Sequence, residues 1–135
     1  MFLFINTALN NKLTIALVSH TLGILDRTDS DINQNHSEKL LPAVEELLSK
    51  NKLILKDLKG IGVVRGPGSF TGVRVGVACA NALGFALNIP VGGVKYRENL
   101  NILNIFRQFK GGQKFKPVVP FYKYKPVSEV CLKSA

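Results

Sequence analysis

Several residue types are scarce in this chain of 135 residues, which has no tryptophan, one methionine and two cysteines. Cys79 and Cys131 are too few for a disulfide framework or a cysteine-rich metal site, so we expect free thiols. The sequence has no run of 18 or more apolar residues, which predicts that it does not span a membrane. Its first residues lack the basic start and long apolar stretch of a signal peptide. These features predict a cytoplasmic protein.

Acidic residues are also scarce, and the imbalance is concentrated at one end. The chain has 9 Asp/Glu against 18 Lys/Arg, for a formal net charge of +9. Residues 101–135 contain 7 Lys/Arg against 1 Asp/Glu. This basic end is compatible with binding to nucleic acid, with binding to an acidic protein surface, or with a solvated tail. The length and the 46% of hydrophobic residues predict one domain with its own core.

The pattern of apolar residues predicts three sequential strands, followed by helices that alternate with strands. The predicted strands are Phe2–Asn6, Leu13–Ser19, Leu22–Arg27, Gly60–Arg65 and Val91–Val94, with a loop at Thr28–Asn35. The predicted helices are Ser37–Lys50, Ser69–Leu87 and Glu98–Phe109, and two further candidate strands are Pro117–Tyr124 and Val127–Leu132. An antiparallel meander continued by parallel strands with crossover helices is the ribonuclease-H-like arrangement. We therefore predict an α/β fold with a βββαβα core and a mixed sheet.

The predicted helix Ser69–Leu87 is apolar almost all round. From Val73 onward its only charged residue is Arg74, and its only other clearly polar residue is Asn81. Small residues recur at every fourth position and stack along one face: Gly72, Gly76, Ala80 and Gly84. This face indicates either close packing on the domain's own sheet, or a sheet on one side and a partner protein's helix on the other. We favour the second interpretation, because one small layer seldom covers a whole helix.

The glycine-rich turn before this helix resembles a phosphate-binding turn only in part. A strand, a turn and a helix N-terminus can hold an anion, and the candidate residues are Arg65, Gly68, Ser69, Thr71 and Arg74. However, the lysine and Ser/Thr pair of a P-loop is absent, and the spacing does not fit a dinucleotide-binding turn. The sequence therefore favours a structural turn, with Ser69 as the helix N-cap.

Four blocks of this sequence resemble the TsaB (YeaZ) family, in unbroken order over about residues 1–100. They are residues 36–42 (HSEKLLP), Asp57-Leu58, residues 66–76 (GPGSFTGVRVG) and residues 88–94 (NIPVGGV). The third block is highly specific. The resemblance implies an actin-like ATPase (ribonuclease-H-like) fold, and a subunit without catalytic activity of its own. It implies a role beside a TsaD-type catalytic subunit and a TsaE-type ATPase, in attaching threonylcarbamoyl to adenosine 37 of tRNA.

The resemblance also implies where the partner binds. Family members pair through two helices of the N-terminal domain, either as homodimers or with the TsaD-type subunit. Carried over to this sequence, the interface residues are His36, Glu38, Leu41, Glu45, Gly72, Val73, Gly76, Ala80 and Gly84. No catalytic residue, cofactor or metal is expected, because His36 has no histidine partner at helical spacing and no nucleophile motif is present.

Two features depart from the family pattern. The first strand of family members usually reads IDTS, whereas this chain has Asn6 in place of the acidic residue. Family members also usually have a second domain of similar size. Here we expect an N-terminal domain over residues 1–110 and a basic remnant or extension over residues 111–135.

Two alternative functions remain open at the level of sequence. One is a nucleotide-binding enzyme of the actin-like superfamily, although Asn6 does not supply the acidic group that handles the metal. The other is RNA binding by the basic end, where lysines alternate with aromatic residues between Arg107 and Lys125. In that segment the aromatic side chains are equally compatible with packing on the core.

Overall fold

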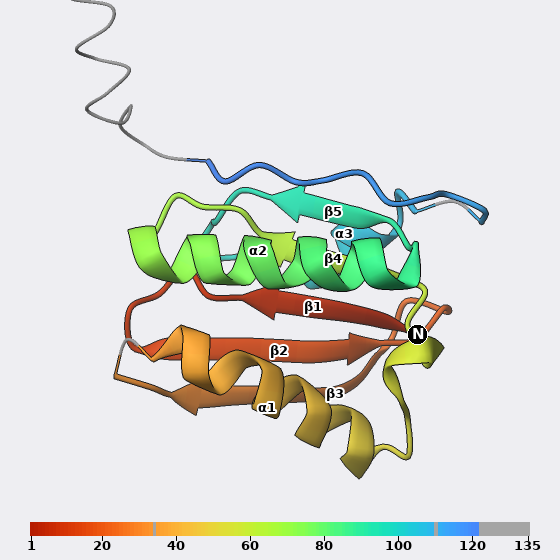
Figure 1. Ribbon diagram of the computed structural model, residues 1–135, viewed down its shortest axis with the longest axis horizontal. Coiled ribbons are helices and arrows are strands. Elements are labelled where there is room, and N and C mark those ends of the chain that lie inside the picture. The colour runs from red at the N-terminus through yellow and green to blue at the C-terminus, as the bar shows by residue number, and fades with distance from the viewer. Residues whose placement is uncertain (34, 110, 122–135) are drawn as a thin grey trace, which may run out of the picture.

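Five strands form one mixed sheet in the computed structural model, which describes residues 1–33, 35–109 and 111–121 (Figure 1). The strands are β1 (Phe2–Asn6), β2 (Lys12–Val18), β3 (Ile24–Asp31), β4 (Gly60–Val64) and β5 (Val91–Val94). Their order in the sheet is β3-β2-β1-β4-β5. The β1–β2 and β2–β3 pairs are antiparallel, and the β1–β4 and β4–β5 pairs are parallel. The predicted meander with parallel continuation is confirmed.

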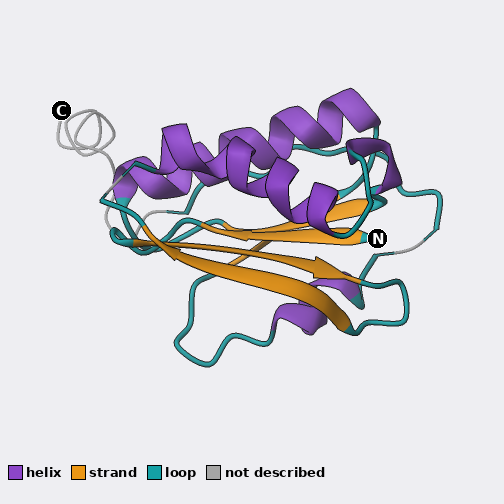
Figure 2. Cartoon of the chain, turned by 90° about the horizontal axis from the view of Figure 1, so that it is seen from below, coloured by secondary structure: helices purple, strands orange, loops and turns teal. Residues whose placement is uncertain are grey.

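Two long helices cover one face of the sheet and a short helix lies on the other (Figure 2). The helices are α1 (His36–Lys50), α2 (Phe70–Leu87) and α3 (Ile102–Phe106), and the 3-10 turn η1 (Leu55–Asp57) precedes β4. Helix α1 contacts β2 and β3, whereas α2 contacts β4, β1 and β5. This confirms the predicted α/β class and the predicted order of elements.

The central strands are buried on both faces, which is why they are almost wholly apolar. All five residues of β4 are buried, and the three middle residues of β1 are 0–1% exposed. Behind the sheet, the ring of Phe106 on α3 stacks on Phe2 with centroids 5.1 Å apart. Gly62 provides the space for this helix, since a Cβ there would lie 2.9 Å from Phe106 Cζ. The sheet therefore contributes a glycine to this contact, and α3 contributes an aromatic ring that packs against it.

Three elements differ from the sequence-based prediction. Strand β3 continues through residues 28–31, which were predicted as loop, because an edge strand needs only backbone pairing with β2 and not a buried face. Helix α3 is five residues long instead of spanning Glu98–Phe109, and it begins where the Asn101 side chain accepts a hydrogen bond from the Leu103 N–H. Residues 117–121 form no strand, and residues 122–132 of the two candidate strands lie outside the described residues.

Helix α2 is long and apolar enough to cross a membrane by length and composition alone. Its 18 residues have a mean hydropathy of 1.4, and 33% of them are buried within the fold. Helices in the cores of other proteins meet the same test, so this finding is weak evidence for a membrane. The sequence had suggested no span because glycine, asparagine and arginine interrupt the strict apolar run.

Candidate protein interface on helix α2

The start of α2 is fixed to the end of β1 by hydrogen bonds. The Ser69 N–H donates to the carbonyl oxygen of Ala8 at 2.7 Å. The Ser69 hydroxyl oxygen accepts from the Gly72 N–H at 3.2 Å, so Ser69 is the N-cap that the sequence predicted. Nearby, the side-chain oxygen of Asn6 accepts from the Ala8 N–H at 3.0 Å. The side chains of Asn6 and Ser69 therefore both accept hydrogen bonds from backbone N–H groups close to them in the sequence.

The residues that were predicted as an anion site lie at two separate places in the structure. Gly68, Ser69, Thr71 and Arg74 lie at the start of α2, where the Arg74 guanidinium is stacked over the ring of Phe70 at 5.2 Å. Arg65 instead lines a cleft between β5 and the α3 segment, which none of the other four residues lines. The five residues consequently do not form one anion-binding group.

One face of α2 is packed on the chain itself. It comprises the small and apolar residues predicted as partner contacts: Gly72, Val73, Gly76, Ala80 and Gly84, all of which are buried. A Cβ on Gly76 would collide with the hydroxyl oxygen of Thr7, and a Cβ on Gly72 would lie 3.0 Å from His36 Cε1. A Cβ on Gly84 would lie 2.8 Å from the ring of Phe115. The glycine face therefore explains close intramolecular packing, and these five residues are not on the surface in this fold.

The opposite face of α2 is open. Its exposed residues are Phe70, Thr71, Arg74, Ala78, Ala82, Phe85 and Ala86, with Phe70 56% and Phe85 75% exposed. Half-buried Cys79 lies between the two faces, and burial raises the pKa of its thiol to about 11. Such an apolar, almost uncharged helix face is typical of protein contact surfaces. These residues are the accessible part of α2, whereas the glycines that were predicted as partner contacts are buried in this fold.

Helix α1 lies beside α2 and presents part of the predicted interface. Glu38, Leu41 and Glu45 are exposed, and Leu41 is 49% exposed. His36 is instead buried at 2% exposure, with its Nε2 donating to the carbonyl oxygen of Lys12 at 3.1 Å in the tautomer that this contact requires. In the part of the chain that the structure describes, no three or more His, Cys, Asp or Glu side chains gather at one point where they could hold a metal ion.

An extended segment after α3 is bound along α2, a contact that the sequence did not predict. The Asn81 side chain donates to the carbonyl oxygen of Val118 at 2.8 Å and accepts from the Val118 N–H at 2.9 Å. The ring of Phe115 meets Phe85 edge-on at 6.0 Å. The signal in the sequence was Asn81 itself, because an amide in an otherwise apolar helix indicates a backbone partner.

The described aromatic residues of the basic end pack on the fold. Phe109 contacts Phe2 and Phe106 edge-on, and Phe115 packs on Phe85. This favours the packing interpretation of the segment for residues 107–109 and 111–121. Lys110 and the remaining part of the segment, residues 122–125, lie outside the described residues.

The comparisons with known proteins agree on one family. The family model described as "TsaD: tRNA N6-adenosine threonylcarbamoyltransferase" matches residues 26–119, which is more than half of the chain. A relative from Bacillus subtilis, "tRNA threonylcarbamoyladenosine biosynthesis protein TsaB", is 42% identical over 96 residues, covering 65% of this chain and 42% of that protein. The protein of the same name from Escherichia coli K12 is 38% identical over 61 residues, covering 45% of this chain and 26% of its own length.

The fold leads to the same group. The solved structure of "YeaZ from Pseudomonas aeruginosa" superimposes with a TM-score of 0.64 at 33% identity, covering 70% of this chain and 43% of that chain. This chain therefore spans less than half the length of these relatives. The family match, the named relatives and the shared ribonuclease-H-like fold together show that the chain belongs to the TsaB (YeaZ) family, within the group that the TsaD family model describes.

Proposed function

We propose that this chain is a non-catalytic interaction subunit in the synthesis of threonylcarbamoyladenosine in tRNA. In this proposal it binds a TsaD-type catalytic subunit, pairs with itself when alone, and works with a TsaE-type ATPase. The names of its TsaB relatives support the pathway, and the description of the matching family model supports the kind of partner.

The open face of α2 carries the proposal. Ala78, Ala82 and Ala86 follow one another at helical spacing on this face, and all three are exposed. Their small side chains would let a partner helix approach closely, while Phe85 at 75% exposure, Phe70 at 56% and Leu41 of α1 at 49% would gain apolar burial. The packed face of α2 already lies on the sheet, so a partner on the open face would give this apolar helix cover on both sides.

A role in binding a partner fits the hydrogen bonding of Asn6 and Ser69 better than a catalytic role does. The amide of Asn6 is bound to the Ala8 N–H at 3.0 Å, and the Ser69 hydroxyl is bound to the Gly72 N–H at 3.2 Å. Both side chains therefore stabilise the turn at the start of α2. We propose that residues 1–110 form the domain that holds the partner, and that the segment after it acts as an extension.

The test is the solution mass of the chain, alone and mixed with the TsaD-type subunit of the same organism. We expect a dimer alone that exchanges into a heterodimer. Ala82→Glu places a charge in the middle of the open face and should weaken both associations by at least about tenfold, as expected for a central contact position. Circular dichroism and the melting temperature would show whether the variant keeps its fold.

Leu25→Glu is the matched control, because it makes the same kind of change at a residue of β3 that is 51% exposed. It should pair as the unmodified chain does. A monomer under both conditions, or pairing of Ala82→Glu at undiminished affinity, would rule out the open face of α2 as the interface.

A further inference from the structure

We propose that the cleft between β5 and the α3 segment binds a nucleoside monophosphate unit, with its phosphate on Arg65, Lys95 and Arg97. The cleft has a volume of about 460 Å³, which is within the usual range for small-molecule sites. It contains neither Asn6 nor the residues at the start of α2, so it differs from the anion site that the sequence suggested. The proposal concerns binding only and is independent of the proposed interface on α2.

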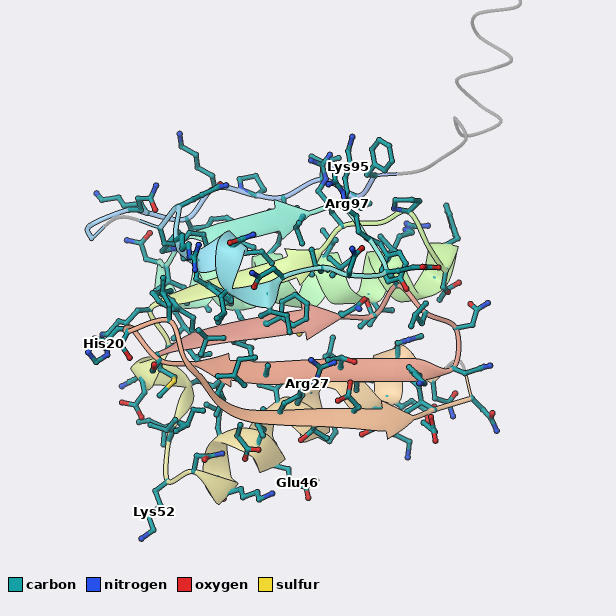
Figure 3. The ribbon with its side chains drawn as sticks, turned by 180° about the vertical axis from the view of Figure 1, so that it is seen from behind. His20, Arg27, Glu46, Lys52, Lys95 and Arg97 are labelled. Carbon is teal, nitrogen blue, oxygen red and sulfur yellow. The ribbon has the colours of Figure 1, made fainter. Side chains whose placement is uncertain are left out.

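The three cations are brought together by the topology of the sheet. Arg65 follows β4, while Lys95 and Arg97 follow β5, and parallel neighbouring strands end at the same edge. The Arg65 N–H donates to the carbonyl oxygen of Val94 at 2.8 Å, which fixes the two strand ends side by side. Figure 3 shows Lys95 and Arg97 close to one another beyond the end of β5.

These positive charges lack acidic partners within the described part of the chain. No carboxylate lines the cleft, and no ion pair joins Arg65, Lys95 or Arg97 to an acidic residue among the described residues. The buried Nε of Arg65 has no hydrogen-bond partner there. The ring of Phe121 lies 4.3 Å from Lys95 Nζ and 5.9 Å from Arg65 Cζ, which offsets only part of the repulsion between the two cations. A phosphate would supply both the missing charge and the missing hydrogen-bond acceptors.

The other side of the cleft has the chemistry to recognise a base. Asn104 and Gln108 line it four residues apart, and amide side chains can donate to and accept from the edge of a base. Neither amide has a hydrogen-bond partner among the described residues. Leu100, Ile105 and Phe109 add apolar surface to the same lining. Cations, amides and apolar side chains in one cleft match the phosphate, the hydrogen-bonding edge and the flat face of the base of a nucleotide.

Two acidic residues line a neighbouring cavity and not the cleft itself. Arg97 also lines a smaller neighbouring cavity of about 210 Å³, which Glu98 and Asp29 line as well. Asp29 forms an ion pair with Arg27, whose Nε donates to Asp29 Oδ2 at 2.8 Å. The acidic side chains therefore lie in the adjoining cavity, and the larger cleft keeps a cationic lining.

The experiment is calorimetric titration of the full chain at low salt with AMP, inorganic phosphate, adenosine and a three-residue RNA, each in turn. We expect saturable binding of AMP, at least tenfold tighter than binding of phosphate or adenosine. The double variant Lys95→Gln with Arg97→Gln, at two exposed positions, should weaken AMP binding at least tenfold. Asn104→Ala should weaken AMP binding while leaving phosphate binding unchanged.

The matched control is Lys52→Gln with Lys56→Gln, which removes the same charge at two exposed positions outside the cleft. It should change AMP binding by less than twofold. Equal loss in the two double variants, or AMP binding no tighter than phosphate binding, would overturn the proposal. If the RNA binds at least tenfold tighter than AMP, and the Lys95→Gln, Arg97→Gln variant loses that affinity by the same factor, the ligand is a nucleotide within an RNA strand. RNA no tighter than AMP would identify it as a free nucleotide.

Discussion

The hydroxyl of Thr7 donates a hydrogen bond of 2.5 Å to the carbonyl oxygen of Gly72, which lies 65 residues later in the chain. This bond joins the end of β1 to the first turn of α2. Thr7 is fully buried, and one helical turn further on Gly76 faces the same hydroxyl. The helix can lie this close to the strand end only because positions 72 and 76 carry no side chain.

The contact between Gly76 and Thr7 predicts that Gly76→Ala destabilises the fold. Helix propensity alone would favour alanine by up to about 1 kcal/mol. The added methyl would collide with the Thr7 hydroxyl, which its bond to Gly72 holds in place, and overpacking of this kind costs about 1–3 kcal/mol or more. We expect the collision to dominate, with the free energy of unfolding in a urea titration lowered by about 2 kcal/mol.

Gly111→Ala is the control for this substitution. Nothing lies within 4 Å of a Cβ built at Gly111, so the change should be neutral or stabilise by about 0.5 kcal/mol. A Gly76→Ala variant that is as stable as Gly111→Ala would contradict the close approach of α2 to β1.

The two hydrogen bonds between Asn81 and Val118 predict that Asn81→Leu releases the segment around Val118 from α2. Asn81 satisfies both the N–H and the carbonyl of Val118, at 2.9 and 2.8 Å. Without these bonds the segment keeps its side-chain packing through Phe115 and Val118, the contacts of the Phe121 ring with Lys95 and Arg65, and the bond from the Phe121 N–H to the Arg65 carbonyl. None of these contacts binds the backbone N–H of Val118. We expect amide hydrogen exchange at Val118 to accelerate at least about tenfold, the factor that corresponds to 1.4 kcal/mol.

Exchange at Ile61, in the middle of the sheet, should stay slow in the same variant. Asn104→Leu is the control, because it removes an exposed side-chain amide that has no hydrogen bond to the described residues. Exchange at the Val118 N–H should stay as slow in this variant as in the unmodified chain. Equal exchange at Val118 in the Asn81→Leu variant and the unmodified chain would show that other contacts hold the segment.

The features that the sequence predicted well are those that depend on local pattern. Helix α2 was predicted with its N-cap at Ser69 because the glycine-proline turn, the capping residue and the apolar run all agree. The spacing of Gly72 and Gly76 also marked a closely packed face. It could not show whether a partner or the chain's own Thr7 approaches that face, because residue spacing is the same in both cases.

The features that the sequence missed depend on contacts between distant segments. The polar end of β3 was predicted as loop because an edge strand is stabilised by backbone pairing, which leaves no apolar pattern. Arg65 was assigned to the start of α2 because it is near Ser69 in the sequence. The parallel pairing of β4 with β5 places it beside Lys95 and Arg97 instead, and only the sheet order reveals this.

The ion pair of Arg27 with Asp29 predicts a loss of stability in acid. Hydrogen bonds from Arg27, together with one from Thr14, hold the pKa of Asp29 below its usual range. The folded chain therefore binds the Asp29 proton less readily than the unfolded chain does. The resulting stabilisation is fully present above the ordinary aspartate pKa of about 4, and it is lost as the pH falls through the lower pKa of the folded state.

Asp29→Asn should flatten the dependence of the free energy of unfolding on pH below about pH 4, because the ionisable group is removed. Arg27→Gln should flatten it as well, and the double variant should be no flatter than Asp29→Asn alone, since both changes remove one interaction. Some slope should persist in every variant, because the hydrogen bond from Asn51 also lowers the pKa of Asp26. Urea titrations at a series of pH values measure these slopes. Asp29→Asn with an undiminished slope would show that the pair contributes nothing to acid sensitivity, as is common for exposed ion pairs.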